Sequence, residues 1–150
     1  MMSPIAEFEK LLDEVPKLIN RIADHEFIHK ASASKWSKQE ILGHLCDSAV
    51  NNHSRFVRII LTDEPIRIDG YKQDEWISIH DYQNNYSKSD LLALWIQLNK
   101  QILNVLRNAS ELDFNKPCIL SDKRRVTLRW LFDDYLSHMR HHIKQLEEQR

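Results

Sequence analysis

Glycine and proline are scarce in this sequence, whose 150 residues include 2 glycines and 4 prolines. Sheet proteins of this size need many tight turns, and these two residue types form such turns most readily. Their scarcity argues against a sheet protein and favours long helices joined by few connections. The length suits one domain with a single sizeable core, so we expect one all-α domain spanning residues 1–150.

Three further absences limit what the protein binds and where it works. No stretch approaches the run of about 18 apolar residues that crosses a membrane, and residues 1–14 are too acidic and too polar for a signal peptide. The 21 basic residues balance 22 acidic ones, which leaves no broad basic surface for nucleic acid. The two cysteines, Cys46 and Cys118, show no metal-ligand spacing. We therefore expect a reduced, cytoplasmic protein that binds neither membranes nor nucleic acid.

Four segments show the apolar periodicity of amphipathic helices. The predicted helices cover Pro4–Ala23, Ser37–Leu61, Ser87–Asn108 and Thr127–Gln149. Ser37 and Ser87 are each followed three residues later by an acidic residue, which is the pattern of a capping box, and Thr127 is a plausible N-cap. Pro16 should kink or break the first helix. Four such helices in a small domain most simply form a four-helix bundle.

Two of the connections are long enough to have structure or function of their own. Thr62–Tyr86, between the second and third helices, is the longest irregular region, and its length permits a crossover instead of a plain up-down topology. The second, Ser110–Val126, predicts a turn with short extended arms at Cys118–Leu120 and Arg125–Val126. The aromatic residues of the first connection could line a pocket or cap the end of the bundle: Tyr71, Trp76 and Tyr82.

Two histidines interrupt the apolar stripe of the last predicted helix. His138 and His142 are four residues apart, which places both imidazoles on one helical face, one turn apart. Such a pair can hold one metal ion from a rigid support. The alternative is a pair of core or interface histidines satisfied by hydrogen bonds, and the pair alone leaves both open. His25 and His29 repeat the spacing, but the end of the first helix explains them, because a helix C-terminus favours cations.

A polar row lies beside the apolar stripe of the second predicted helix. It consists of His44, Asp47, Asn51 and Arg55, at steps of three or four residues. As a solvated face this row would have no function. As a cavity wall it would supply a metal ligand in His44, a group that orients it in Asp47, and anchors for an anionic ligand in Asn51 and Arg55. Cys46 lies on a different side of the helix from His44, so we do not expect the two to share a metal.

The motifs occur in an order that is itself informative. WSKQEILGHLCDS at residues 36–48 is followed by PIRIDGYKQDEW at residues 65–76 and by SHMRHHIKQL at residues 137–146. In this combination the chain resembles the DinB-like superfamily of four-helix-bundle metalloproteins. The resemblance is closest to the branch that contains bacillithiol transferases and metal-dependent hydrolases.

The resemblance implies a site and its occupants. Carried over by position, the metal ligands are His44, His138 and His142. The family commonly binds nickel or zinc, with iron as a further choice, and often forms homodimers that use a low-molecular-weight thiol. His141 points about 100° away from His142 on the helix, so we do not expect it to be a ligand.

The expected function follows from three neutral imidazoles, which leave coordination positions open for catalysis. The resemblance favours a metal-dependent thiol S-transferase that joins a small thiol to an electrophilic small molecule. The sequence offers no convincing nucleophile of its own, which fits a thiol cosubstrate. The residues expected to bind substrate are Asn51, Arg55, Tyr71 and Trp76. Two alternatives are a metal-dependent hydrolase that uses metal-bound hydroxide and a non-catalytic, stress-associated dimeric bundle.

Overall fold

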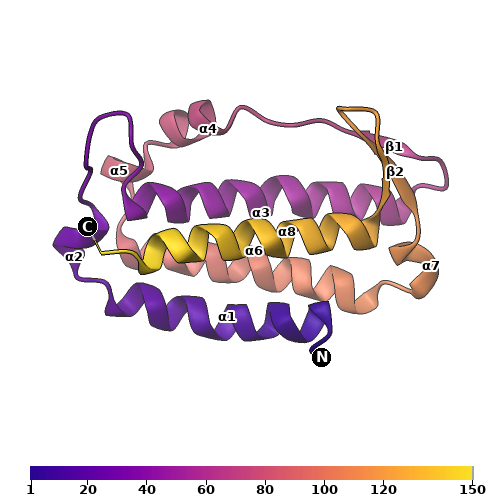
Figure 1. Cartoon of the computed structure of the whole chain (residues 1–150), viewed down its shortest axis with the longest axis horizontal. Coiled ribbons are helices and arrows are strands. Elements are labelled where there is room, and N and C mark those ends of the chain that lie inside the picture. Colours follow the sequence, from indigo (N-terminus) through magenta and orange to yellow (C-terminus); the bar gives the residue numbers. More distant parts are fainter. Residues whose placement is uncertain (150) are drawn as a thin grey trace.

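The computed structural model describes residues 1–149, and its main body is a bundle of four long helices (Figure 1). These helices are α1 (Pro4–Arg21), α3 (Lys38–Leu61), α6 (Lys88–Asn108) and α8 (Leu128–Glu147). Both α1 and α3 contact α6 and α8, so α1 and α3 occupy diagonal corners of the bundle. The all-α four-helix bundle predicted from the sequence is confirmed.

The side chains expected to cap the helices do so. The Ser37 hydroxyl accepts a hydrogen bond from the backbone N–H of Glu40 at 3.1 Å, and the Glu40 carboxylate accepts one from the backbone N–H of Ser37 at 3.0 Å. The hydroxyls of Ser87 and Thr127 cap α6 and α8 by accepting from the backbone N–H groups of Asp90 and Trp130. Among the described residues Asp90 does not return a hydrogen bond to Ser87, so the capping box predicted there is only half formed. Helix α1 continues across Pro16 without a break, because Val15 and Ile19 on either side are buried in the core.

The connection between α3 and α6 runs back along the bundle (Figure 1). It contains β1 (Ile66–Ile68), α4 (Gln73–His80) and α5 (Tyr82–Asn85). Both short helices contact α3, so the chain returns to the end where α3 began, and α6 runs parallel to α3. The long connection predicted here is confirmed, but short elements occupy much of what was expected to be irregular chain.

A small sheet covers one end of the bundle. Strand β2 (Pro117–Leu120) pairs antiparallel with β3 (Arg125–Thr127), which confirms the two extended arms expected there. Strand β1 adds to the other edge of β2 in parallel, with Ile68 opposite Leu120. Through β2, the sheet links β1, at the start of the long connection, to β3, which leads directly into α8. The remaining short helices are α2 (Asp24–Phe27) and α7 (Glu111–Phe114).

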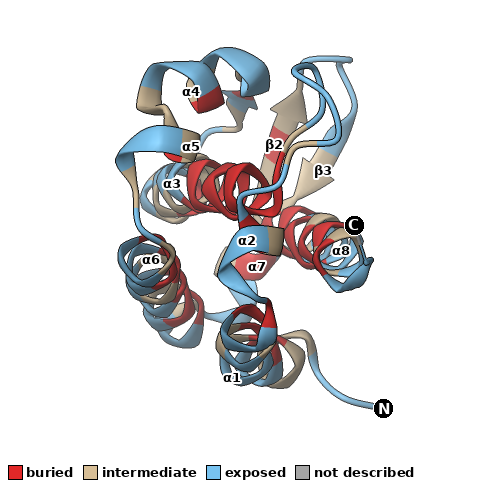
Figure 2. Ribbon diagram, turned by 90° about the vertical axis from the view of Figure 1, so that its left-hand side faces the viewer, coloured by how far each residue is buried: buried red, intermediate tan, exposed pale blue. Residues whose placement is uncertain are grey.

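The buried faces of the long helices point toward one another (Figure 2). One continuous core runs from Phe8 in α1 to Leu146 in α8, and its largest fully buried side chain is Trp95. Polar side chains are buried in it as hydrogen-bonded pairs, for example where the Tyr135 hydroxyl donates to the Asn99 side-chain oxygen at 2.5 Å. Among the described residues, no helix has the length of apolar sequence that crossing a bilayer requires.

Candidate metal centre

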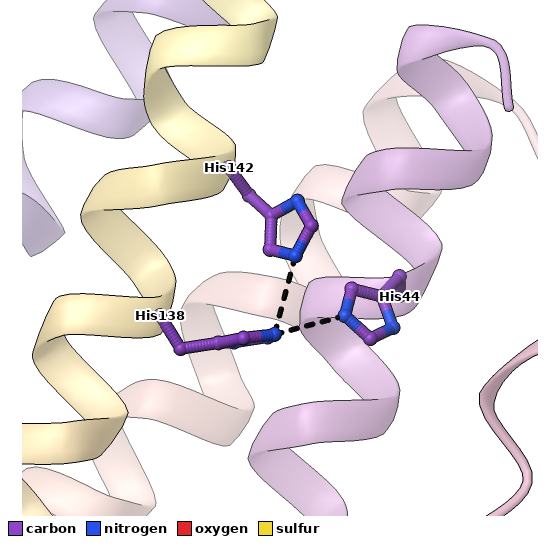
Figure 3. A group of neighbouring side chains, drawn as sticks. All are labelled: His44, His138 and His142. Atoms are coloured by element: carbon purple, nitrogen blue, oxygen red, sulfur yellow. Dashed lines mark hydrogen bonds between the residues drawn. The ribbon is translucent and has the colours of Figure 1, made fainter.

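Three histidines from two neighbouring helices converge inside the bundle (Figure 3). His44 comes from near the start of α3, and His138 and His142 come from the second half of α8. The Nε2 atom of His138 lies 3.1 Å from that of His44 and 3.2 Å from that of His142. The two helices therefore have the register that brings together the three ligands implied by the sequence resemblance.

Hydrogen bonding among the three rings does not account for this arrangement. An imidazole nitrogen carries either one hydrogen or one available lone pair, so the Nε2 of His138 can make one good hydrogen bond. Two further Nε2 atoms lie within 3.2 Å of it. Three ring nitrogens pointed at a common position are what a divalent ion binds in a three-histidine site. The donor set therefore fits a metal ion.

Burial keeps the three imidazoles neutral. His44 is 0% exposed and His142 is 8% exposed, while His138 is half-buried. Desolvation, followed by the neighbouring histidines, lowers the pKa of His44 from 6.5 to about 3 and that of His138 to about 4. Burial also lowers the pKa of His142. Near pH 7 all three rings can offer a lone pair, which metal binding requires.

An aromatic side chain closes one side of the centre. The Trp36 ring centroid lies 4.8 Å from that of His44 and 6.5 Å from that of His142. His141 is exposed on the surface of α8 and does not belong to the converging group. Its predicted exclusion from the ligand set therefore agrees with the geometry.

Asp47 does not hydrogen-bond to His44, the partner predicted for it, but contacts two other side chains. Its Oδ1 accepts a hydrogen bond from the Tyr82 hydroxyl at 2.5 Å and lies 3.8 Å from the Nδ1 of His80. The Nδ1 of His44 is buried without a hydrogen-bond partner in the described part of the chain. The hydrogen bond expected to orient His44 is therefore not formed, and Asp47 instead fastens α5 to α3.

A cavity of about 330 Å³ opens beside the centre, and His138 forms part of its wall. Of the four residues predicted to bind substrate, Arg55 and Tyr71 line this cavity, whereas Asn51 and Trp76 do not. The Asn51 amide donates to the backbone carbonyl of Asp47 at 2.9 Å within α3. The ring of Trp76 packs against that of Tyr71, with centroids 5.4 Å apart, and so supports the wall from behind.

Several lining residues escaped the sequence analysis. Ser48 and Asn52 face the cavity, so the polar row that matters is His44, Ser48, Asn52 and Arg55. Its steps of four, four and three were visible in the sequence, one residue away from the row chosen. Asp134 also lines the cavity, four residues before His138, where helical spacing could have found it. No local signal indicates the lining residues that the fold brings in around the β2–β3 turn and the start of α8: Arg124 and Trp130.

Arg55 is the cation best placed to receive an anion in the cavity. One guanidinium nitrogen donates to the backbone carbonyl of Asp69 at 2.6 Å, and the group lies over the Tyr71 ring at 5.9 Å. No carboxylate in the described residues lies within ion-pair distance of it. Burial lowers the pKa of Arg55, but a guanidinium stays charged near pH 7. Its charge is therefore available to a ligand.

Neither cysteine has the properties of a nucleophile. Both Cys46 and Cys118 are buried. Burial, and then the charge of Asp47, raise the pKa of the Cys46 thiol, and burial raises the pKa of the Cys118 thiol. Because the thiolate is the reactive form, both side chains are chemically inert near pH 7.

Sequence comparison connects this chain to proteins whose names refer to metals. YfiT of Bacillus subtilis, provisionally named a metal-dependent hydrolase, is 26% identical over 144 residues, which cover 93% of this chain and 80% of YfiT. A protein of Oceanobacillus iheyensis with the same provisional name is 24% identical over 143 residues, covering 93% of this chain and 81% of its own length.

Comparison with solved structures identifies the same fold. The structure of YfiT, described as having an unusual four-helix-bundle topology, matches with a TM-score of 0.79 at 25% identity, over 98% of this chain and 87% of YfiT. A mycothiol-dependent maleylpyruvate isomerase matches with a TM-score of 0.69 at 13% identity, over 93% of this chain and 58% of its own. At that identity it shows the fold alone. The family model of the DinB superfamily matches residues 7–146, and this chain therefore belongs to the DinB superfamily.

Proposed function

We propose that the protein is a metal-dependent enzyme that transfers a low-molecular-weight thiol to an electrophilic small molecule in the cavity beside His138. The observation that carries this proposal is the convergence of three neutral imidazoles next to a cavity whose described lining includes neither cysteine of the protein. His44, His138 and His142 would hold nickel or zinc, with iron as a further choice. Such an ion, when bound, supplies Lewis acidity that lowers the pKa of a thiol or water beside it.

The residues of the chain have separate tasks in this proposal. Arg55 binds an anionic part of the thiol and fixes its orientation, since no carboxylate of the described residues forms an ion pair with it, although Asp69 and Asp134 line the same cavity. Tyr71 forms the wall beside Arg55 and limits the width of the cavity. Trp36 covers the rings of His44 and His142 and keeps bulk water from that side of the centre.

Hydrolysis is the second candidate, because the two relatives compared above have hydrolase names. The same centre can present water instead of a thiol. A panel of electrophiles and activated esters, assayed with and without added thiols, separates the two. We expect turnover that depends on the thiol. Equal turnover without any thiol would favour the hydrolase, and product analysis would then show an incorporated oxygen instead of a sulfur.

The first test is metal content, measured by elemental analysis of protein purified without a histidine tag. We expect on the order of one divalent ion per chain, and none in a folded His138→Ala, His142→Ala double variant. His141→Ala is the matched control and should keep its metal, because His141 lies outside the converging group. A wild-type protein that takes up none of nickel, zinc and iron contradicts the proposal.

The anion site has its own test. Replacing Arg55 with alanine should raise the KM for an anionic thiol by about tenfold or more, because a charge-assisted hydrogen bond is lost. Arg58→Ala, one turn further along α3 on its exposed side, serves as the control and should leave KM unchanged. An unchanged KM in Arg55→Ala would remove Arg55 from the site.

A further inference from the structure

The three histidines differ in what their second ring nitrogen contacts. A neutral imidazole can bind an ion through Nε2 only if its single hydrogen is on Nδ1. In the described residues, His142 alone among the three has a hydrogen bond at Nδ1, where the side-chain oxygen of Gln145 lies at 2.8 Å. The Nδ1 of His44 is buried without a partner.

From this contact we infer that Gln145 is a positioning residue that holds His142 in the tautomer able to bind a metal. An amide oxygen has no hydrogen and can only accept, so the contact requires the hydrogen to be on Nδ1 of His142. The lone pair is then on Nε2, the atom that faces His138 at 3.2 Å. Gln145 follows His142 by three residues on α8, so the helix itself brings the two side chains together.

The choice of an amide over a carboxylate has a chemical consequence. A carboxylate at this position would make the imidazole a stronger donor and add a negative charge beside the centre. The amide fixes the ring orientation without adding charge. A bound ion then keeps more of its Lewis acidity, which the proposed thiol transfer uses. This benefit of the amide rests on the proposed function. The tautomer itself does not, because it is a property of the metal-free protein.

The tautomer can be measured directly by nitrogen NMR of the histidine rings in metal-free protein. We expect the hydrogen of His142 on Nδ1 in the wild type and in Gln145→Glu, which keeps an acceptor. In Gln145→Met, which keeps the length but removes the acceptor, we expect the Nε2–H form to become populated. A wild-type His142 with its hydrogen on Nε2 overturns the inference, and this measurement decides it even if the methionine variant does not fold.

Metal affinity is the second readout, measured as zinc binding in competition with a chelator. Gln145→Met should bind zinc about 10- to 100-fold more weakly, the usual effect of losing a group that orients a ligand. Gln145→Glu and Lys144→Ala, a change at the exposed neighbouring position, should stay within a few-fold of the wild type. Unchanged affinity in Gln145→Met overturns the inference. Absence of zinc binding in the wild type would instead contradict the proposed function and leave the tautomer result standing.

Discussion

At the scale of single residues, burial decides the chemistry of the centre by keeping its histidines neutral. The pKa of His44 is about 3 and that of His138 about 4 in the folded protein, against an ordinary value of 6.5. Between these values the unfolded chain binds more protons than the folded one. The free energy of unfolding of the metal-free protein should therefore fall as the pH is lowered from about 6.5 toward 3, and stay level above 6.5 with respect to these groups.

Urea unfolding of metal-free protein at several pH values between 4 and 7 checks this expectation. Carboxylates also titrate in this range, so the informative quantity is the difference from a His44→Asn variant. In the variant, the free energy of unfolding should depend less steeply on pH. The slope should be smaller by up to about 1.4 kcal/mol per pH unit, the largest contribution that one titrating group can make. Identical pH dependence in the two proteins would show that His44 does not have a lowered pKa.

The buried cysteines lead to a second prediction at this scale. Because both thiols have raised pKa values, Cys46→Ala and Cys118→Ala should keep the turnover found in the thiol-transfer assay. Each should cost about 1–2 kcal/mol of stability, since a buried sulfur is replaced by a smaller group. Turnover at saturating thiol, compared with circular dichroism as a check on folding, measures this. Lost turnover in a folded variant would mean that the protein supplies its own nucleophile.

At the scale of elements, one glycine determines how the long connection docks. The Tyr82 ring of α5 packs directly on Gly43 of α3, where an added Cβ would lie 2.2 Å from a ring carbon. The Gln39 side-chain amide, also on α3, donates a hydrogen bond to the backbone carbonyl of Tyr82 at 2.5 Å and so holds α5 in place. The contact holds the connection against the helix that carries His44.

Replacing Gly43 with alanine should therefore destabilise the protein. Alanine favours a helix by up to about 1 kcal/mol over glycine, but overpacking against the ring should outweigh this and leave a net loss of about 1–3 kcal/mol. Gly70→Ala is the control, because no atom lies within 4 Å of its added Cβ. Thermal denaturation of both variants measures the difference. Equal melting temperatures would show that α5 moves aside at little cost.

The elements also show how far the sequence could predict the structure. Helix starts were predictable because Ser37, Ser87 and Thr127 act on backbone groups within three residues. The pairing of β1 with β2 was not predictable, because it joins segments that are distant in the sequence. The cavity wall was missed by one helical position, with Asn51 chosen in place of Asn52. Periodicity finds a face, but only packing determines which neighbouring face meets the cavity.

At the scale of the whole molecule, the centre joins α3 to α8 and should couple metal binding to stability. An ion that binds only the folded state stabilises it by about 2.7 kcal/mol at a free concentration 100 times its Kd. The melting temperature should rise on adding zinc to the wild type. It should not rise in the His138→Ala, His142→Ala variant, and a similar rise in both would place the stabilising ion elsewhere.

The long distance in sequence between His44 and the two histidines of α8 has a consequence for biosynthesis. His44 and His138 are 94 residues apart in the sequence, and the helix that carries His138 and His142 is the last of the four to leave the ribosome. A nascent chain that has made α1, α3 and α6 has one imidazole of the centre and no site. An ion therefore cannot template the early steps of folding. The three imidazoles exist together only after His142 has been synthesised, so under the proposed function the metal pool that meets the finished chain would decide which ion it carries.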